Sequence, residues 1–269
     1  MCPKPALAAT FLVLLSAPAW AARPVPAAAQ ASQPAAQPHK PTPEERAEAD
    51  RMDPLARATF WSQVADAFPR DIPAGVSQAR ALRELARYDE AVAAAERVLV
   101  VDPADLEALL ECARDHIAAG QGFFAIDPAQ RAAALAPRDW RPVSLLAVAL
   151  EQSQRDDEAR AAHQRALTLA PENPAALSNL AIYDAAHGDT TQAEALLRKA
   201  VAEPGATAQE RLNLALILGL EGRVDEAERL ERRDLPPATV DNNLAYLRAA
   251  GPVSTPRSWS AVQGAAQSP

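Results

Sequence analysis

The residues that most often carry chemistry are few in this chain and stand far apart. Its histidines and cysteines are His39, His116, His163, His187, Cys2 and Cys112. No His-x-x-x-His pair occurs, and the two cysteines lack a metal-binding spacing. We therefore expect no metal site, and each histidine is better explained as an ordinary core or surface residue.

Nucleophilic and phosphate-binding chemistry is not indicated either. We expect no general base within reach of Cys112. The glycines stand singly, as Gly120, Gly188 and Gly222 do, rather than in a loop that cradles phosphates. The carboxylates are numerous but scattered, in positions that cap helices or face solvent. We therefore predict that the protein is not an enzyme and has no cofactor.

The elements that position these residues repeat every 34 residues. Two alanine series keep this period without insertion: Ala79, Ala113, Ala147, Ala181 and Ala215, and Ala91, Ala125, Ala159, Ala193 and Ala227. Pro69, Pro103, Pro137 and Pro171 keep the same phase. Only a small side chain fits where two antiparallel helices cross closely, and a proline just beyond a helix stops it. The pattern therefore predicts stacked pairs of antiparallel helices.

This unit resembles the tetratricopeptide repeat (TPR) family, which has small residues at its eighth and twentieth positions and proline at its thirty-second. The segments "RYDEA", "RDDEA" and "GRVDEA" are also similar to its loops. The resemblance implies an all-α, right-handed TPR solenoid of four full repeats and a shortened fifth, with a capping helix at each end. The repeats are 72–105, 106–139, 140–173, 174–207 and 208–235. Gly75 and Arg211 depart from the bulky residue usual at the fourth position.

Two further helices are expected to cap the stack. Residues 53–69 read as a half-repeat whose Phe60, Trp61, Val64 and Phe68 have core-facing spacing. Residues 237–250 read as a last helix, with Leu244 and Leu247 against the fifth repeat. A solenoid leaves an apolar face open at each end, and such helices cover it. Within the repeats, His116 and His163 occupy core-facing positions, and Cys112 stands where later repeats have leucine, so we expect a small buried hydrophobe there.

The ends of the chain differ in composition from the repeats. Residues 1–21 have a lysine, an apolar run and the small-residue segment "AWA", and this order predicts an export signal. The apolar run is too short to be a stable membrane span. Residues 22–43 are rich in Ala, Pro and Gln and predict a disordered linker, and 251–269 predict a disordered tail. The solenoid is expected over 44–250.

The net charge of −8 argues against a nucleic-acid partner. We expect an exported protein, in the periplasm of a Gram-negative bacterium.

The TPR resemblance also implies a binding groove lined by the first helix of each repeat. Its inward positions place polar and apolar candidates for binding a protein or peptide partner: Asn179, Asn213, Arg80, Arg114, Arg141, Ile182 and Leu216. An asparagine amide offers a donor and an acceptor, so Asn179 and Asn213 suit the backbone of an extended peptide. The arginines suit a carboxylate or an acidic stretch. Asparagine is nevertheless common at this TPR position, and exposed arginine is common on any solvated helix.

Residues 206–249 are similar to the C-terminal part of the TadD-type proteins of the tight-adherence (Flp) pilus assembly system. The segments "DPLARATFW" and "ALAPRDWRP" add to this likeness. It implies a scaffold or adaptor that aids assembly of this pilus machinery, with the outer-membrane secretin or another assembly component as its partner. Members are commonly lipoproteins, and this chain has no cysteine directly after its predicted signal. Two alternatives stay open: an adaptor in another envelope assembly pathway, and a non-catalytic docking subunit of an envelope enzyme.

Overall fold

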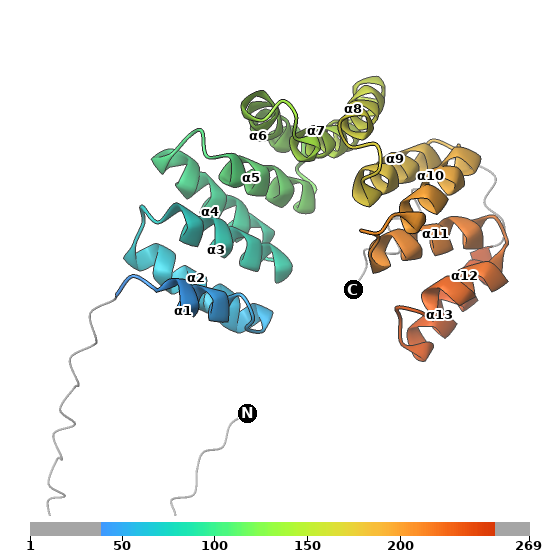
Figure 1. The fold of residues 1–269 in the computed structure, drawn as a ribbon, viewed down its shortest axis with the longest axis horizontal. Coiled ribbons are helices and arrows are strands. Elements are labelled where there is room, and N and C mark those ends of the chain that lie inside the picture. Colours follow the sequence, from blue (N-terminus) through green and yellow to red (C-terminus); the bar gives the residue numbers. More distant parts are fainter. Residues whose placement is uncertain (1–38, 251–269) are drawn as a thin grey trace, which may run out of the picture. The chain divides into compact units, whose positions relative to one another are not determined.

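The computed structural model describes residues 39–250, and within them the chain is entirely α-helix, turn and loop (Figure 1). The helices are α1 (Pro43–Ala49), α2 (Pro54–Ala67), α3 (Ile72–Glu84), α4 (Tyr88–Val101), α5 (Leu106–Ala118), α6 (Gly122–Leu135), α7 (Trp140–Gln152), α8 (Asp156–Leu169), α9 (Pro174–Ala186), α10 (Thr190–Ala202), α11 (Ala208–Leu220), α12 (Val224–Glu231) and α13 (Pro237–Ala250). The expected all-α class is confirmed. The predicted signal, the linker up to residue 38 and the tail lie outside the described residues.

Polar residues at a 34-residue period start the first helix of each repeat. The caps are Asp71, Asp105, Asp139, Asn173 and Thr207, and each side chain accepts a hydrogen bond from a backbone N–H in the first turn. This bond satisfies one of the donors that a helix start leaves unpaired. The same period continues after each first helix, where Ala86, Gly120, Gln154, Gly188 and Gly222 all have a positive φ angle. Each first helix therefore has a local start signal and a local stop.

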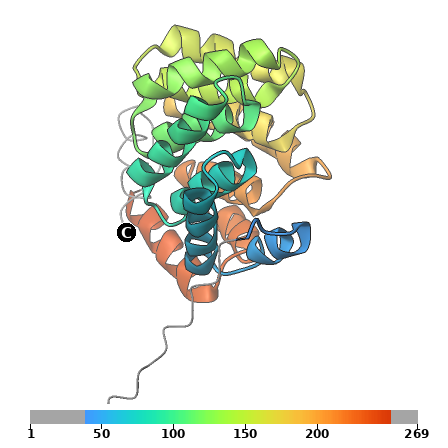
Figure 2. The ribbon, with the colours of Figure 1, turned by 90° about the vertical axis from the view of Figure 1, so that its left-hand side faces the viewer.

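The alanine series forms the close crossing points of the helix pairs. All ten alanines are fully buried. Each first helix packs against its own second helix, against the next first helix, and against the second helix before it (Figures 1 and 2). Among the described helices, successive second helices such as α4 and α6 are not in backbone contact, although the side chain of Arg198 on α10 reaches Glu226 on α12 at 3.4 Å. The stack is therefore closed on the first-helix side and more open between the second helices.

The two ends are covered as the capping prediction requires. Trp61 and Val64 of α2 are buried, and Phe60 and Phe68 pack against the same core cluster. At the other end Leu244 and Leu247 of α13 are buried against the fifth repeat. Gly219 of α11 leaves the space that Leu247 occupies, because a Cβ atom at position 219 would lie 2.4 Å from Leu247 Cδ1. The shortened second helix of the fifth repeat is α12, with eight residues.

The ordered chain extends further toward the N-terminus than the linker prediction of 22–43 allowed. A capping box of Thr42 and Glu45 starts helix α1 at Pro43. Arg46 of α1 binds Asp71 at 2.6 Å and lies over the ring of Trp61. Lys40 also reaches Asp71, at 3.3 Å. Residues 40–43 are therefore part of the folded unit, which begins at Lys40. No helix within 39–250 is both long enough and apolar enough to cross a bilayer.

Candidate protein-binding faces

The predicted site residues all lie on first helices. Arg80 is on α3, Arg114 on α5, Arg141 on α7, Asn179 and Ile182 on α9, and Asn213 and Leu216 on α11. Because successive first helices contact one another, these side chains form a row along one side of the stack. The row divides into a charged part on α3, α5 and α7 and an uncharged part on α9 and α11.

Glu111 is the centre of the charged part. Its side chain is fully buried, yet three arginines bind it. Arg80 Nη2 lies 3.0 Å and Arg114 Nη1 2.7 Å from Oε1, while Arg83 Nη2 lies 2.8 Å from Oε2. Burial alone would raise the pKa of Glu111, but the hydrogen bond from Arg83 and the charges of all three arginines outweigh it and lower the pKa. Glu111 is therefore ionised and holds Arg80 and Arg114 in place.

Asp115 is a second buried carboxylate, one turn after Glu111. Its Oδ1 atom forms an ion pair with Arg83 Nε at 2.8 Å, and Oδ2 has no hydrogen-bond partner in the described chain. Burial raises the pKa of Asp115 to about 7, although the charge of Arg83 opposes this. The two acids therefore differ in their ease of ionisation, because three arginines bind Glu111, whereas Arg83 alone pairs with Asp115 within the described chain. Asp115 is a functional-site candidate that was not predicted from the sequence.

Arg141 also has partners within the chain. Its guanidinium binds the capping residue Asp139 at 2.6 Å and Glu107 of α5 at 3.1 Å. The hydrogen bond with Asp139 is the main cause of its raised pKa. Arg80, Arg114 and Arg141 are thus not a row of free cations. Each is held by an acid of its own or a neighbouring first helix, and the acidic-ligand role predicted for them stays a prediction.

The uncharged part contains a repeated side-chain hydrogen bond. Asn179 Nδ2 donates to Ser144 Oγ at 2.8 Å, and Asn213 Nδ2 donates to Ser178 Oγ at 2.8 Å. Both bonds span 35 residues and join one first helix to the next. Asn213 Oδ1 also accepts from Gln209 Nε2 at 2.9 Å. Both asparagines remain partly exposed. The sequence contained the signal for this bond, a serine series one position before the asparagine series, but the partner serines were not predicted.

Ile182 and Leu216 lie beside the asparagines. Both are partly buried and pack against the core cluster shared by α9, α11 and α13. They therefore contribute to packing between repeats as well as to the exposed face. Their predicted role in binding a partner stays a prediction.

The histidines and Cys112 are placed where the repeat register indicated. His116 and His163 are buried, and His187 is at the end of α9. His116 lies one turn after Cys112, but burial raises the pKa of the thiol to about 12, so it is protonated at neutral pH. Within residues 39–250 no group of three or more metal-ligating side chains is close enough to hold an ion.

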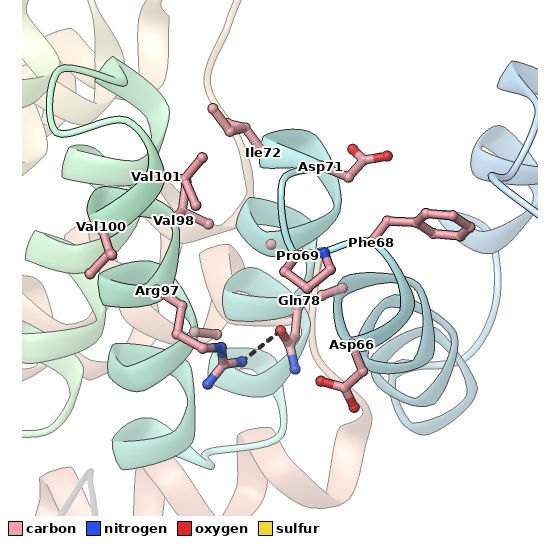
Figure 3. Close-up of a pocket in the computed structure, with 13 residues that line it drawn as sticks. Asp66, Phe68, Pro69, Asp71, Ile72, Gln78, Arg97, Val98, Val100 and Val101 are labelled. Carbon is pink, nitrogen blue, oxygen red and sulfur yellow. Dashed lines mark hydrogen bonds between the residues drawn. The ribbon is translucent and has the colours of Figure 1, made fainter. Parts of the chain in front are cut away.

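The gaps between second helices contain cavities that the sequence analysis did not predict. One of about 350 Å³ lies between α2 and α4, over α3. Figure 3 shows Arg97 of α4 reaching Gln78 of α3, at 3.0 Å, with Val98, Val100 and Val101 on the same side. Cavities of about 480 Å³ and 280 Å³ lie in the α4–α6 and α10–α12 gaps. Each is open to the side of the stack opposite the first-helix row.

Basic residues at one repeat position of the second helices bind earlier parts of the chain. Arg131 Nη2 donates to the carbonyl of Pro103 at 2.6 Å, and Lys199 Nζ donates to that of Pro171 at 2.9 Å. Each bond ties a second helix to the turn 28 residues earlier. Arg97 occupies the same register but binds Gln78 instead. The first gap therefore lacks this tie, and Gly75, in place of a bulky residue, lies at its floor.

Comparison with known proteins agrees with the fold. A tetratricopeptide repeat family model matches residues 143–175, which is about one repeat. A thermophilic TPR protein of Thermus thermophilus is 24% identical over 66% of this chain and 99% of that one, with a TM-score of 0.60. A TPR protein of Parabacteroides merdae is 14% identical over 72% and 78%, with a TM-score of 0.63. No curated protein matches the sequence.

The paired helices, their 34-residue period and the row of touching first helices define a helical-repeat solenoid. The family model matches one repeat of this solenoid, and the two similar structures share its fold. A stack of this kind is suited to protein–protein interaction.

Proposed function

We propose that this protein is a periplasmic TPR adaptor that binds an extended segment of a partner protein along the first-helix row. The observation that carries the proposal is the pair of asparagines, Asn179 and Asn213. A primary amide has two N–H donors, and each Nδ2 atom uses one of them on a serine. The second donor of each amide, and the Oδ1 atom of Asn179, are available to a peptide backbone.

The charged part of the row supports the same proposal. Arg80 and Arg114 are bound to Glu111 through some of their donors, and about half and a quarter of their side-chain surface stays exposed. A guanidinium has five N–H donors, so both can bind a further carboxylate. Glu111 fixes their positions in advance, which lowers the entropic cost of binding. We infer that an acidic stretch of the partner binds here.

The partner class that we propose is a component of the tight-adherence (Flp) pilus machinery, with the outer-membrane secretin as the first to test. The support is the similarity of residues 206–249 to the TadD-type proteins and the export-signal pattern of residues 1–21. The protein would then be exported to the periplasm and associate with the outer membrane through its partner. In this proposal it has no catalytic step of its own.

The test is a pull-down of the secretin with purified full-length protein. Asn179→Ala combined with Asn213→Ala should reduce secretin capture at least about tenfold, because it removes both backbone-binding amides. The matched control is Ser144→Ala with Ser178→Ala, which breaks the same two internal hydrogen bonds but keeps the asparagines. If both double variants lose capture equally, the asparagines act through stability and the groove proposal is wrong.

A second arm tests the pilus assignment separately from the groove. Capture by the wild-type protein of another envelope complex, with none of the secretin, would move the adaptor to a different assembly pathway. Capture of an envelope enzyme whose activity depends on this chain would make it a docking subunit. After either result, the asparagine and serine double variants can be compared in the same way with the new partner.

A further inference from the structure

Two adjacent phenylalanines at the start of α6 stand in positions that the other repeats keep polar. Phe123 and Phe124 are 71% and 62% exposed. The residues at the same repeat positions are Asp89 and Glu90, Asp157 and Glu158, Thr191 and Gln192, and Asp225 and Glu226. Acidic residues in a first helical turn are favourable, because they interact with the positive end of the helix. The second repeat lacks this favourable interaction at the start of α6 and exposes two aromatic rings there instead.

The rings continue into an apolar gap between α4 and α6. Phe124 forms one wall of the cavity of about 480 Å³, Leu99 and Val100 form the opposite wall, and Cys112 lies at its floor. Val100 is 83% exposed and also borders the α2–α4 cavity. The side of α4 that carries Val100 and Val101 is visible in Figure 3. A contiguous exposed apolar surface of this kind is typical of an interaction site.

The polar side chains that line the gap are the acids Glu96 and Asp127, the base Arg131, and His116. Glu96 borders it and makes no ion pair or hydrogen bond within the described chain. Asp127 binds Arg131 at 3.2 Å, and Arg131 is further held by the carbonyl of Pro103. Pro128, inside α6, has no N–H, so the carbonyl of Phe124 lacks its usual bond from the residue four positions later. The free carboxylate and this carbonyl can both accept a hydrogen bond from a partner.

We propose that the α4–α6 gap, with Phe123 and Phe124 at its edge, is a second docking surface for a partner segment that is both apolar and basic. Apolar side chains of the partner pack against Phe124 and Val100, and a lysine or arginine binds Glu96. A second copy of this chain is the less favourable occupant, because the protein carries a net charge of −8 and the gap is itself acidic. The surface is opposite the asparagine row and independent of it.

The test uses a fluorescently labelled helical peptide of about 14 leucine and lysine residues, roughly four helical turns, with fluorescence anisotropy as the readout. Two control peptides replace all lysines by glutamate or all leucines by serine. We expect the leucine–lysine peptide to bind and both controls to bind at least about tenfold more weakly. Tight binding of the serine–lysine peptide would overturn the proposal, because it would show attraction to net charge alone.

Variants locate the binding on the protein. Phe123→Asp with Phe124→Glu restores the acidic pair of the other repeats and should weaken binding about tenfold or more, although it adds negative charge. Phe123→Thr with Phe124→Gln should do the same without a change of charge. Both changes are on the surface, so the circular dichroism spectrum should not change. Full affinity in either variant would exclude this site.

A matched pair of charge variants tests Glu96. Glu96→Gln should weaken binding several-fold, whereas Glu48→Gln, the same charge change at an exposed position of α1, should not. Equal losses would contradict the proposal. Asn179→Ala with Asn213→Ala should leave peptide affinity unchanged. Sedimentation completes the test: a dimer that Phe123→Asp with Phe124→Glu dissociates would identify a second copy as the occupant and reject the basic partner.

Discussion

Asn213 Nδ2 donates to Ser178 Oγ at 2.8 Å, and this bond joins the first helices of two successive repeats. Asn179 and Ser144 repeat the bond one unit earlier at the same distance. An asparagine that is common at this position of the repeat thus has a structural use before any ligand arrives. The polar groups left over after this bond are the ones available for recognition.

The bond between Asn179 and Ser144 should appear as a coupling in a double-mutant cycle. We expect Asn179→Ala and Ser144→Ala each to lower the free energy of unfolding by about 1 kcal/mol, and the double variant to lose about 1 kcal/mol less than the sum. Urea unfolding of the four proteins measures this. Additive losses would show that the bond does not contribute to stability.

The buried carboxylate of Glu111 should be among the most sensitive charged positions. Glu111→Gln keeps the shape but removes the charge that three arginines share, and we expect a loss of about 2–4 kcal/mol in the free energy of unfolding. The control is Glu107→Gln, which removes the exposed partner of Arg141 and should cost less than about 1 kcal/mol. Denaturant titration compares the two. Similar small losses would mean that the arginines rearrange freely around a neutral side chain.

Asp115 should make stability depend on pH in the direction opposite to Glu111. Burial raises its pKa to about 7 in the folded chain, against about 3.9 when unfolded, so the folded state holds this proton more tightly. Its contribution to the free energy of unfolding is therefore fully present below about pH 4 and is lost as the pH rises to about 7.

The variant Asp115→Asn cannot titrate and should not show this loss. Relative to wild type, its free energy of unfolding should improve by about 2–3 kcal/mol between about pH 5 and pH 8. Urea unfolding at the two pH values measures the difference. The titration of Glu111 is present in both proteins and largely cancels. A difference that stays the same at both pH values would show that Asp115 is ionised throughout.

Gly75 should resist replacement even by alanine. A Cβ atom there would lie 2.4 Å from Val98 Cγ2, so Gly75→Ala should cost about 1–3 kcal/mol by overpacking. In a Val98→Ala background the clash is absent, and the same change should stabilise by about 1 kcal/mol, since alanine favours a helix over glycine. Thermal unfolding of the single and double variants tests this reversal of sign. A loss in both backgrounds would place the conflict elsewhere.

The sequence predicts the helices well because their signals are local and repeated. The first helices begin at Ile72, Leu106, Trp140, Pro174 and Ala208, each directly after a capping side chain. The alanine series likewise predicts the crossing points, since every crossing needs the same small residue. Helix α1 was missed because a proline-rich composition hid the capping box of Thr42 and Glu45.

The side-chain network was less accessible from sequence. How Arg83 is shared between Glu111 and Asp115 depends on the angle at which α3 packs against α5. Residue spacing in the sequence does not give that angle. Phe123 and Phe124 were different: their departure from the acidic pair of the other repeats is visible once the repeats are aligned. Comparing repeats position by position therefore recovers exposed anomalies, while ion pairs between helices require coordinates.

Backbone contacts that run along the first helices, but not between successive second helices, give each junction a preferred axis of rotation. A small turn of one repeat about this axis changes the width of the second-helix gap while breaking few packed contacts. A segment wedged between α4 and α6 would fix the angle between the first two repeats, and with it the spacing of Arg80 and Arg114 on the opposite side. Occupancy of the α4–α6 gap would thus be felt by the two arginines of the charged part, while the asparagines on α9 and α11 lie beyond its reach.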